Sequence, residues 1–201
     1  VARALQLPER ELPIDPYLMG YWLGNGSSTD YEITVRDSDV EAVRAQIPYE
    51  IKSEVVQPGS HRLRIPALKA ILVDSFRDKA IPSEYLRASE GQRWSLLQGL
   101  MDSDGCISRE KSQSVYVSTI RQLAESVREL LWSLGIKNAM TVGPSLRCGK
   151  PTGETLYTIR FTTFEDQPTS RLKRKYDRKR ERTKKTRSCF HYLQDIQPLP
   201  Y

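Results

Sequence analysis

The feature that most constrains the fold is a pattern that occurs twice in the chain. Residues 18–26, LMGYWLGNG, and residues 97–105, LQGLMDSDG, are each a largely apolar run with an internal glycine and a glycine at the end. Superposing the two runs places Asn25 on Asp104. A period of about 80 residues is too long for the small units of a solenoid, so it indicates two pseudo-symmetric halves.

Each copy lies in a predicted helix with a clear start. Asp15 followed by Pro16 supplies an N-cap and a proline at the first helical position, and this helix is predicted to run to Gly24. Ser89 and Gln92 have the spacing of a capping box, which opens a second helix that ends at Gly105. Both predicted ends are glycines, which commonly terminate helices.

The segments that follow the two helices also correspond. Residues 31–46 and 115–136 each have the pattern of a strand followed by an amphipathic helix. Each half then offers two further strands before a polar helical or turn segment. These strand candidates are residues 50–56, 61–67, 138–143 and 156–163. We therefore predict an α+β fold of two αββαββα halves. The expected divisions are 1–88 and 89–187 for the halves and 188–201 for a C-terminal extension.

Small and acidic residues mark the two helices as unusual. Gly20, Gly24 and Gly99 each cost about 1 kcal/mol of helix propensity relative to alanine, which close approach of two backbones would offset. Two ordinary buried helices with glycine caps are the simpler alternative. That alternative does not explain Asp102 and Asp104 near a helix C-terminus, where the helix dipole disfavours negative charge unless a cation neutralises it.

The net charge of +6 is concentrated in one segment. Residues 171–187, RLKRKYDRKRERTKKTR, hold eleven Lys or Arg against two acidic residues, a net of +9 that leaves −3 for the rest. Such a concentration of positive charge is typical of a surface that contacts phosphates. In the alternative interpretation the run is a solvated helix face or tail, and the chain is an interaction domain in which the run serves solubility or targeting.

Composition favours a globular protein of the cell interior. Apolar residues make up 38% and charged residues 28%, which excludes a disordered chain. No apolar run approaches the ~20 residues that a membrane span needs. The three cysteines are widely spaced and fit neither a disulfide framework nor a zinc site, so we expect a reducing, cytoplasmic setting.

The two copies resemble the paired signature helices of LAGLIDADG homing endonucleases. Residues 78–86, DKAIPSEYL, resemble the lysine-containing segment before the second signature helix of intein-borne members. Residues 172–180, LKRKYDRKR, resemble the basic segment that closes the second half, and residues 189–200 resemble the return to a splicing domain. The chain has no N-terminal Cys or Ser nucleophile and no closing His-Asn pair. We therefore expect the endonuclease module without splicing activity.

The resemblance implies that the two halves carry four-stranded antiparallel sheets that form a saddle over double-stranded DNA. A two-stranded ribbon fits the major groove, where base pairs can be distinguished. The resemblance also implies a monomer that needs no protein partner and binds a long asymmetric target. The candidate DNA-contacting residues are Arg36, Arg62, Arg64, Arg160, Lys173, Arg174 and Lys175.

The resemblance further implies metal-dependent hydrolysis of phosphodiester bonds, giving a double-strand break. Mg²⁺ or another divalent cation, two or three per site, would bind where the paired helices end. Asp102 is separated from Asp104 by about 200° around the helix, so we expect it to buttress the site. The candidate catalytic residues are Asn25, Asp104, Lys79 and Lys175, with Lys173 as the alternative second-half lysine. The candidate metal ligands are Asp104, Asn25, Gly24 and Ser103.

Asn25 departs from the family pattern, which has an acid at this position. An amide oxygen carries no charge, whereas hard cations favour carboxylates. We therefore expect DNA binding to persist and cleavage to be impaired or lost. The alternatives are a LAGLIDADG-type module that binds DNA without cutting it and an RNA maturase, which would bind folded RNA.

Overall fold

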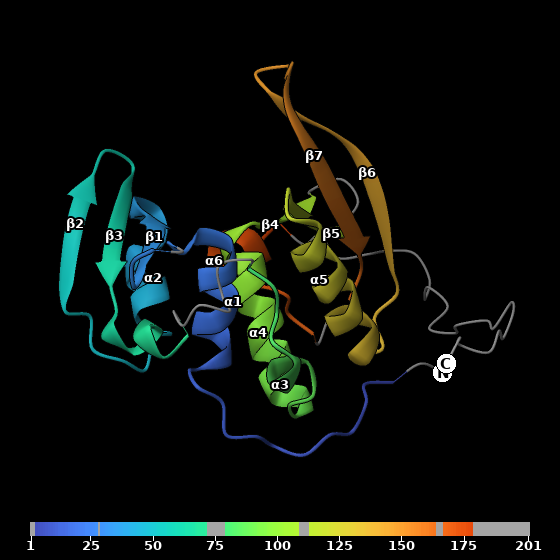
Figure 1. The fold of residues 1–201 in the computed structure, drawn as a ribbon, viewed down its shortest axis with the longest axis horizontal. Helices are drawn as coiled ribbons and strands as arrows, with labels where there is room; N and C mark the ends of the chain where they lie inside the picture. Colours follow the sequence, from blue (N-terminus) through green and yellow to red (C-terminus); the bar gives the residue numbers. More distant parts are fainter. Residues whose placement is uncertain (1–2, 28, 72–78, 109–112, 164–166, 179–201) are drawn as a thin grey trace, which may run out of the picture.

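The computed structural model of the chain describes residues 3–27, 29–71, 79–108, 113–163 and 167–178. Two helices, α1 (Pro16–Asn25) and α4 (Glu90–Ser103), pack along each other at the centre, and a β-sheet lies on either side of them (Figure 1). Both sheets are antiparallel. The α+β architecture of two related halves predicted from the repeat is therefore confirmed.

Both central helices begin where their capping residues predict. The Asp15 carboxylate accepts a hydrogen bond from the Leu18 amide at 3.0 Å, ahead of Pro16. Ser89 and Gln92 form the predicted capping box at the start of α4. α1 ends at Asn25, one residue later than predicted, and α4 ends at Ser103 with Asp104 as its C-cap. The two residues aligned by the repeat therefore lie at corresponding helix ends.

The first sheet has three strands in the order β1-β3-β2. They are β1 (Glu32–Arg36), β2 (Ser53–Gln57) and β3 (Ser60–Arg64). The short helices η1 (Asp37–Asp39), α2 (Val40–Arg44) and η2 (Pro66–Ala70) accompany it. The four-stranded sheet expected for this half is reduced, because a single bridge between Gly26 and Ile33 replaces the first strand in the described residues.

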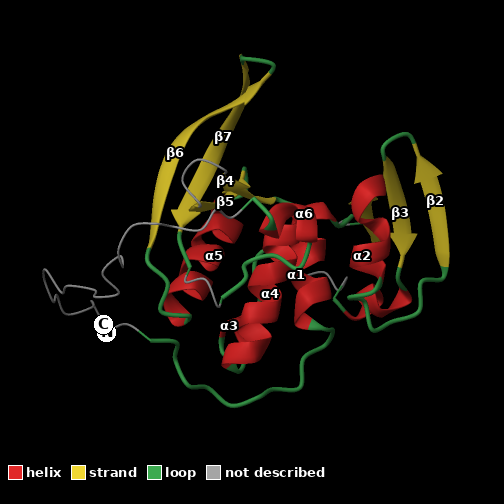
Figure 2. Ribbon diagram, turned by 180° about the vertical axis from the view of Figure 1, so that it is seen from behind, coloured by secondary structure: helices red, strands yellow, loops and turns green. Residues whose placement is uncertain are grey.

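The second sheet has four strands in the order β4-β5-β7-β6. They are β4 (Gly105–Ser108), β5 (Gln113–Ser118), β6 (Asn138–Arg147) and β7 (Lys150–Phe161). The amphipathic helix α5 (Arg121–Ser133) covers one face, and the short helices α3 (Ser83–Leu86) and α6 (Lys173–Tyr176) lie near the central pair (Figures 1 and 2). The β6–β7 hairpin projects beyond the body of the protein (Figure 2).

The projecting hairpin is longer than the sequence predicted. Its two-residue loop is Cys148-Gly149, with φ of 51° and 77°, and Arg147 pairs with Lys150 on either side. Positive φ at both loop residues is the signature of a type I′ turn, which matches the twist of the flanking strands. Cysteine is not a usual residue for this turn, and the sequence prediction ended the first strand at Gly143 and began the second at Leu156 instead.

Glycine allows the two central helices to touch through their backbones. A Cβ added at Gly20 would lie 2.2 Å from the carbonyl oxygen of Leu96, and one added at Gly99 would lie 2.1 Å from that of Tyr17. Both distances are far inside van der Waals contact. The predicted close approach is confirmed, and it explains the glycines that weaken both helices.

The core surrounds this central pair. Tyr17 to Leu23 are all buried, so α1 shows no polar face, as expected for a helix packed on every side. Both sheets bury the strand residues that alternate with exposed ones, for example Ile33 and Val35 in β1. None of the helices in the described part of the chain is long and apolar enough to cross a membrane.

Candidate functional site

The candidate site lies where α1 and α4 end together. A Cβ added at Gly24 would lie 2.2 Å from Ser103 Oγ and 3.0 Å from Asp104 Oδ2, so the last turn of each helix contacts the other. The side chain of Asn25 lies near enough to the Tyr21 hydroxyl to oppose the rise that burial causes in the pKa of Tyr21. Three of the four residues predicted to hold metal therefore come together at the seam, and Asn25 lies at the matching helix end.

Asp104 is exposed to solvent, unlike Asp102 two residues before it. The protein around it nevertheless removes enough water to raise the pKa of its carboxyl, an effect that the positive charges of Lys79 and Lys175 oppose. A carboxylate that solvent reaches and that two cations face can bind a ligand from the outside. This arrangement suits the role that the repeat predicted for Asp104.

Two lysines occupy equivalent places at the two helix ends. Lys79 Nζ donates to the carbonyl oxygen of Gly26 at 2.7 Å, and Lys175 Nζ donates to that of Gly105 at 2.8 Å. The repeat aligns Gly26 with Gly105, so each lysine caps the end of one central helix. Cations at these ends complement the helix dipoles and supply the neutralisation that the acids at α4 require.

The two lysines differ in how deeply they are held. Lys175 is buried and also donates to the carbonyl oxygens of Met101 and Asp102, both at 2.8 Å. This burial lowers the pKa of Lys175 to about 8. The Lys79 ammonium is half-buried above the ring of Trp22, 5.5 Å from its centroid, and burial lowers its pKa as well.

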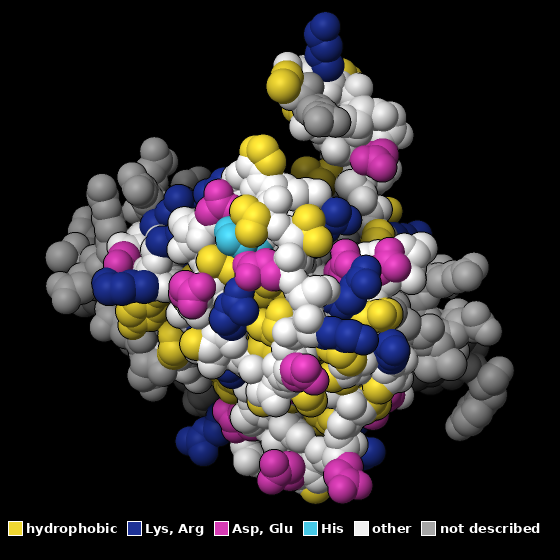
Figure 3. All heavy atoms as spheres, turned by 90° about the vertical axis from the view of Figure 1, so that its left-hand side faces the viewer, with side chains coloured by type: hydrophobic (Ala, Val, Ile, Leu, Met, Phe, Trp, Pro, Cys, Tyr) yellow, Lys and Arg dark blue, Asp and Glu magenta, His cyan; other side chains and the backbone are white. Residues whose placement is uncertain are grey.

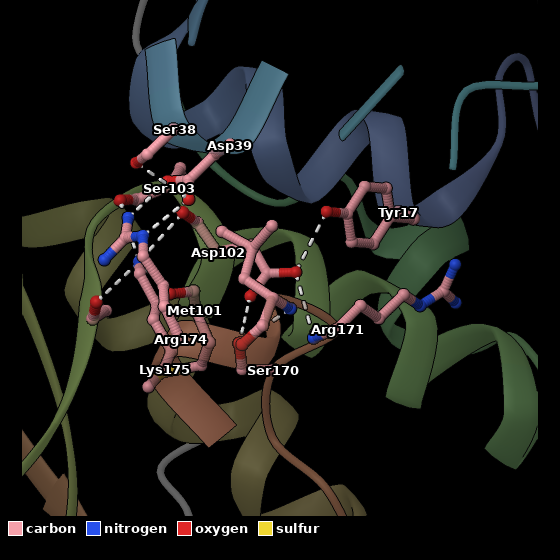
Figure 4. Close-up of polar contacts among 12 residues, drawn as sticks. Tyr17, Ser38, Asp39, Met101, Asp102, Ser103, Ser170, Arg171, Arg174 and Lys175 are labelled. Carbon is pink, nitrogen blue, oxygen red and sulfur yellow. Dashed lines mark hydrogen bonds and ion pairs between the residues drawn. The ribbon is translucent and has the colours of Figure 1, made fainter. Parts of the chain in front are cut away.

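Asp102 supports the site from within the protein, as its position on the helix predicted. Its carboxylate is buried and accepts a hydrogen bond from the Tyr17 hydroxyl at 2.9 Å, and a second from the Arg171 amide at 3.0 Å. The Ser170 hydroxyl donates to its other oxygen (Figure 4). Asp102 therefore joins α1, α4 and the segment before α6, and it does not face solvent beside Asp104.

The first sheet exposes a face with charged residues. In β1, Glu32, Thr34 and Arg36 alternate with buried residues, and the register places Arg64 opposite Glu32 and Arg62 opposite Thr34. Arg64 forms an ion pair with Glu32 at 2.7 Å. Basic and acidic side chains are mixed over this side of the molecule (Figure 3). Local acids therefore accompany the arginines of this face.

The second sheet presents one of the predicted DNA-contacting arginines on its open face. Arg160 of β7 is exposed, and its guanidinium donates to the Thr141 hydroxyl of β6 at 2.8 Å. The register pairs Arg160 with Val115 of β5, and the neighbouring β7 residues Ile159 and Phe161 are buried against α5. The open faces of both sheets flank the ends of α1 and α4 (Figure 1).

The described part of the basic segment differs from a surface of phosphate contacts. Lys173 of α6 is exposed and forms an ion pair at 2.6 Å with Asp177, the residue that follows this helix. Arg174 instead forms a two-pronged ion pair with the buried Asp39 of the first half, and Lys175 is buried as described above (Figure 4). The side chains of Arg174 and Lys175 therefore point inward, because their N–H groups donate hydrogen bonds to buried acceptors. Residues 179–187 of the segment and the extension 188–201 lie outside the described residues.

The oxygen ligands at the ends of α1 and α4 are suited to one divalent cation. The described residues contain no cluster of three or more His, Cys, Asp or Glu that could hold a metal. Ser103 Oγ is directed back to its own helix, 2.9 Å from the carbonyl oxygen of Leu100. Mg²⁺ commonly binds one or two carboxylates and completes its shell with substrate phosphates and water. Asp104 meets that minimum for one ion, whereas Asn25 supplies no charge for another.

Sequence reasoning missed several residues that build the site. Asp39 and Arg171 gave no local signal, because their partners lie far away in the chain. Tyr116 of β5 is fully buried, and its hydroxyl has no hydrogen-bond partner among the described residues. The alternation of apolar residues in β5 could have placed Tyr116 on the core face of the sheet.

Comparison with known proteins identifies one domain and one fold. Residues 92–167 match the model of a LAGLIDADG-like domain. The chain is 33% identical over 198 residues to the replicative DNA helicase DnaB of Mycobacterium intracellulare, a match that covers 98% of this chain and 32% of that protein. The chain thus spans about a third of the length of this relative.

Two solved structures share the fold of the chain. The crystal structure of I-DmoI in complex with DNA and Mn matches 75% of this chain and 89% of its own, with a TM-score of 0.50 and 15% identity. A structure of mesophilic variants of the homing endonuclease I-DmoI matches 78% and 92%, with a TM-score of 0.50 and 16% identity. At this identity the likeness establishes the fold.

Proposed function

We propose, from the premise that residues 92–167 form a LAGLIDADG-like domain, that this chain binds a long asymmetric DNA duplex as a monomer. The duplex would lie across the open faces of both sheets, over the joined ends of α1 and α4. The observation that carries this proposal is the meeting of Gly24, Ser103 and Asp104 at the seam, between two sheets whose open faces bear arginines. The two halves differ in sequence, so each would bind a different half-site.

The residues at the seam support a phosphodiester-cleaving centre with one acid. Asp104 would hold a divalent cation together with phosphate oxygens of the DNA. Such a cation, when bound, polarises a phosphate oxygen and activates water. Lys79 and Lys175 hold positive charge at both helix ends near the phosphates, while their ammonium groups fix the carbonyls of those ends. Two or three ions per site would require a second charged ligand, which Asn25 does not supply.

Asn25 favours a second candidate function, a module that binds DNA and does not cut it. Asparagine has nearly the size and shape of aspartate, so the fold and the DNA surface would be preserved. Only the charge is missing. We infer that binding is the retained activity and that cleavage is strongly reduced.

The match to a DNA helicase supports the proposal that this module is carried within a host protein. A LAGLIDADG-like domain whose chain corresponds to one third of a replicative helicase suits an endonuclease segment carried within a host protein, as in an intein. An intracellular, reducing location follows from that interpretation. The exposed thiols of Cys106 and Cys148 are free, which is compatible with it.

A selection of bound duplexes from a random pool tests the proposal. The expected result is one asymmetric site bound by one protein chain, with Mg²⁺-dependent nicking that is weak or absent. A palindromic site bound by a dimer would contradict the proposal. Preferential binding of folded RNA would favour the maturase alternative, and weak binding without sequence preference would favour an interaction domain.

A further inference from the structure

Residues 170–175, here called the closing segment, contact both halves of the protein. The Arg171 guanidinium donates to Gln98 Oε1 of α4 at 2.8 Å and to Gln46 Oε1 of the first half at 3.0 Å. Its carbon centre lies 4.5 Å from the centroid of the Tyr17 ring in α1. One side chain of the closing segment therefore bridges the first half and α4.

The strongest contact of the closing segment with the first half is an ion pair. Arg174 donates through Nε and an end nitrogen to both carboxylate oxygens of Asp39, which is 4% exposed (Figure 4). Burial alone would raise the pKa of Asp39, but the hydrogen bonds and charge of Arg174 outweigh it and lower that pKa. Two-pronged arginine–carboxylate pairs fix orientation as well as distance.

The next residue anchors the second half. Lys175 donates to the carbonyl oxygens of Met101, Asp102 and Gly105, which surround Asp104 in the sequence. Consecutive Cα atoms are about 3.8 Å apart, so a single peptide unit joins the anchor on Asp39 to the anchor on α4. The two anchoring side chains are therefore adjacent in the chain and contact different halves.

We propose that the closing segment is a clamp between the two halves, and that Arg174 is a positioning residue that sets Asp104 against the end of α1 by holding Asp39. Arg171, Arg174 and Lys175 then stabilise the arrangement of the halves, and among the described residues DNA contacts fall to Lys173 and to the sheets. Buried ion pairs add little net stability but can specify one arrangement among several, which is the role of this one.

Spin labels on both halves test the clamp without DNA, so the result does not depend on the proposed function. The labels are placed at Thr34→Cys in β1 and Gln122→Cys in α5, both exposed, after Cys106, Cys148 and Cys189 are replaced by serine. The unmutated pair should show one narrow distance distribution by double electron–electron resonance. Arg174→Gln should at least double its width.

The matched control is Lys173→Gln, which removes one charge and the ion pair with Asp177 at the same short helix. It should leave the distance distribution unchanged and lower the melting temperature by less than about 2 °C. Arg174→Gln should lower the melting temperature by about 5 °C or more, because it leaves the Asp39 carboxylate buried without its partner. Arg174→Lys keeps the charge and loses the two-pronged geometry, so it should give an intermediate width.

A purely stabilising ion pair predicts a different result. The melting temperature would fall in Arg174→Gln while the distance distribution stayed as narrow as in Lys173→Gln, and that outcome would overturn the clamp. If Arg174→Gln does not fold, Arg174→Lys decides: an unchanged width in a folded Arg174→Lys protein rejects the proposal in the same way.

Discussion

Gly20 of α1 lies against the backbone of α4, and Gly99 of α4 lies against the backbone of α1. A Cβ on Gly20 would lie 2.2 Å from the Leu96 carbonyl oxygen, and a Cβ on Gly99 would lie 2.1 Å from that of Tyr17. Neither neighbour is a flexible side-chain end that could move aside. The helix contact that brings Asp104 to Gly24 therefore requires residues without a Cβ at positions 20 and 99.

Gly99→Ala should destabilise the protein by about 3 kcal/mol or more, because overpacking against backbone forces the helices apart. Gly91 of the same helix is the matched control, since a Cβ there meets nothing within 4 Å. Gly91→Ala should raise the unfolding free energy by about 0.5–1 kcal/mol through helix propensity. Urea unfolding measures both. Equal effects of the two substitutions would contradict the close packing of the helices.

The free energy of unfolding should rise as the pH increases above about 8 and should then fall at higher pH. Burial lowers the pKa of Lys175 to about 8, so between that pH and its ordinary value near 10.5 the unfolded chain binds more protons and stability rises with pH. Burial of Lys79 acts in the same direction. Burial raises the pKa of Tyr17 and Tyr21 above 10, so the unfolded chain loses those protons first and stability falls at higher pH.

Thermal unfolding from pH 7 to 11 checks this profile. Lys175→Met removes the titrating group and should flatten the rise between pH 8 and 10, while Lys173→Met, which alters an exposed lysine of the same helix, should leave it intact. A rise of equal slope in Lys175→Met would show that another group produces it.

Two buried tyrosines should respond oppositely to loss of the hydroxyl. Tyr116 has an unpartnered hydroxyl among the described residues, so Tyr116→Phe should be neutral or should stabilise the protein by about 1 kcal/mol. The Tyr85 hydroxyl donates to the Ile14 carbonyl at 3.0 Å and accepts from the Ile14 amide at 3.1 Å. Tyr85→Phe should cost about 1–3 kcal/mol. A loss in Tyr116→Phe as large as that in Tyr85→Phe would reveal a partner for Tyr116.

Salt dependence of DNA binding should identify the exposed cations that contact phosphates. Each phosphate contact contributes about 0.9 to the slope of log K against log[salt], so Arg36→Ala or Lys173→Ala should each reduce the slope by about that amount. Arg121→Ala is the control, because Arg121 pairs with Glu125 on α5, away from the proposed DNA surface. Fluorescence anisotropy at several salt concentrations gives the slopes. Equal slopes for all three variants and the parent would exclude these contacts.

Local signals predicted much of the fold, and long-range contacts account for what was missed. The caps at Asp15 and Ser89 depend on neighbours within three residues, so sequence alone could place both central helices. The extended β6–β7 hairpin was missed because its Cys148-Gly149 turn lacks the usual residues. The repeat alone was enough to bring Gly24, Ser103 and Asp104 together.

The inward direction of Arg174 and Lys175 could not be predicted in this way. A run of basic residues suggests a solvated surface, and nothing near it in the chain points to its acceptors. Asp39 lies 135 residues from Arg174, and the carbonyls that bind Lys175 become available only at the end of α4. Their roles in catalysis and DNA binding stay predictions.

The most direct test of the central claim is the rate at which Asn25→Asp cleaves a bound cognate duplex. The second carboxylate at the joined helix ends should raise Mg²⁺-dependent cleavage of a supercoiled plasmid carrying the site by at least about a hundredfold over the parent, as expected for restoring one preorganised charged group. Asp104→Asn added to that variant should abolish the gain, and metal-free binding should change little. If Asn25→Asp binds the site as tightly as the parent and cuts it no faster, Asn25 does not occupy the position of a missing catalytic acid.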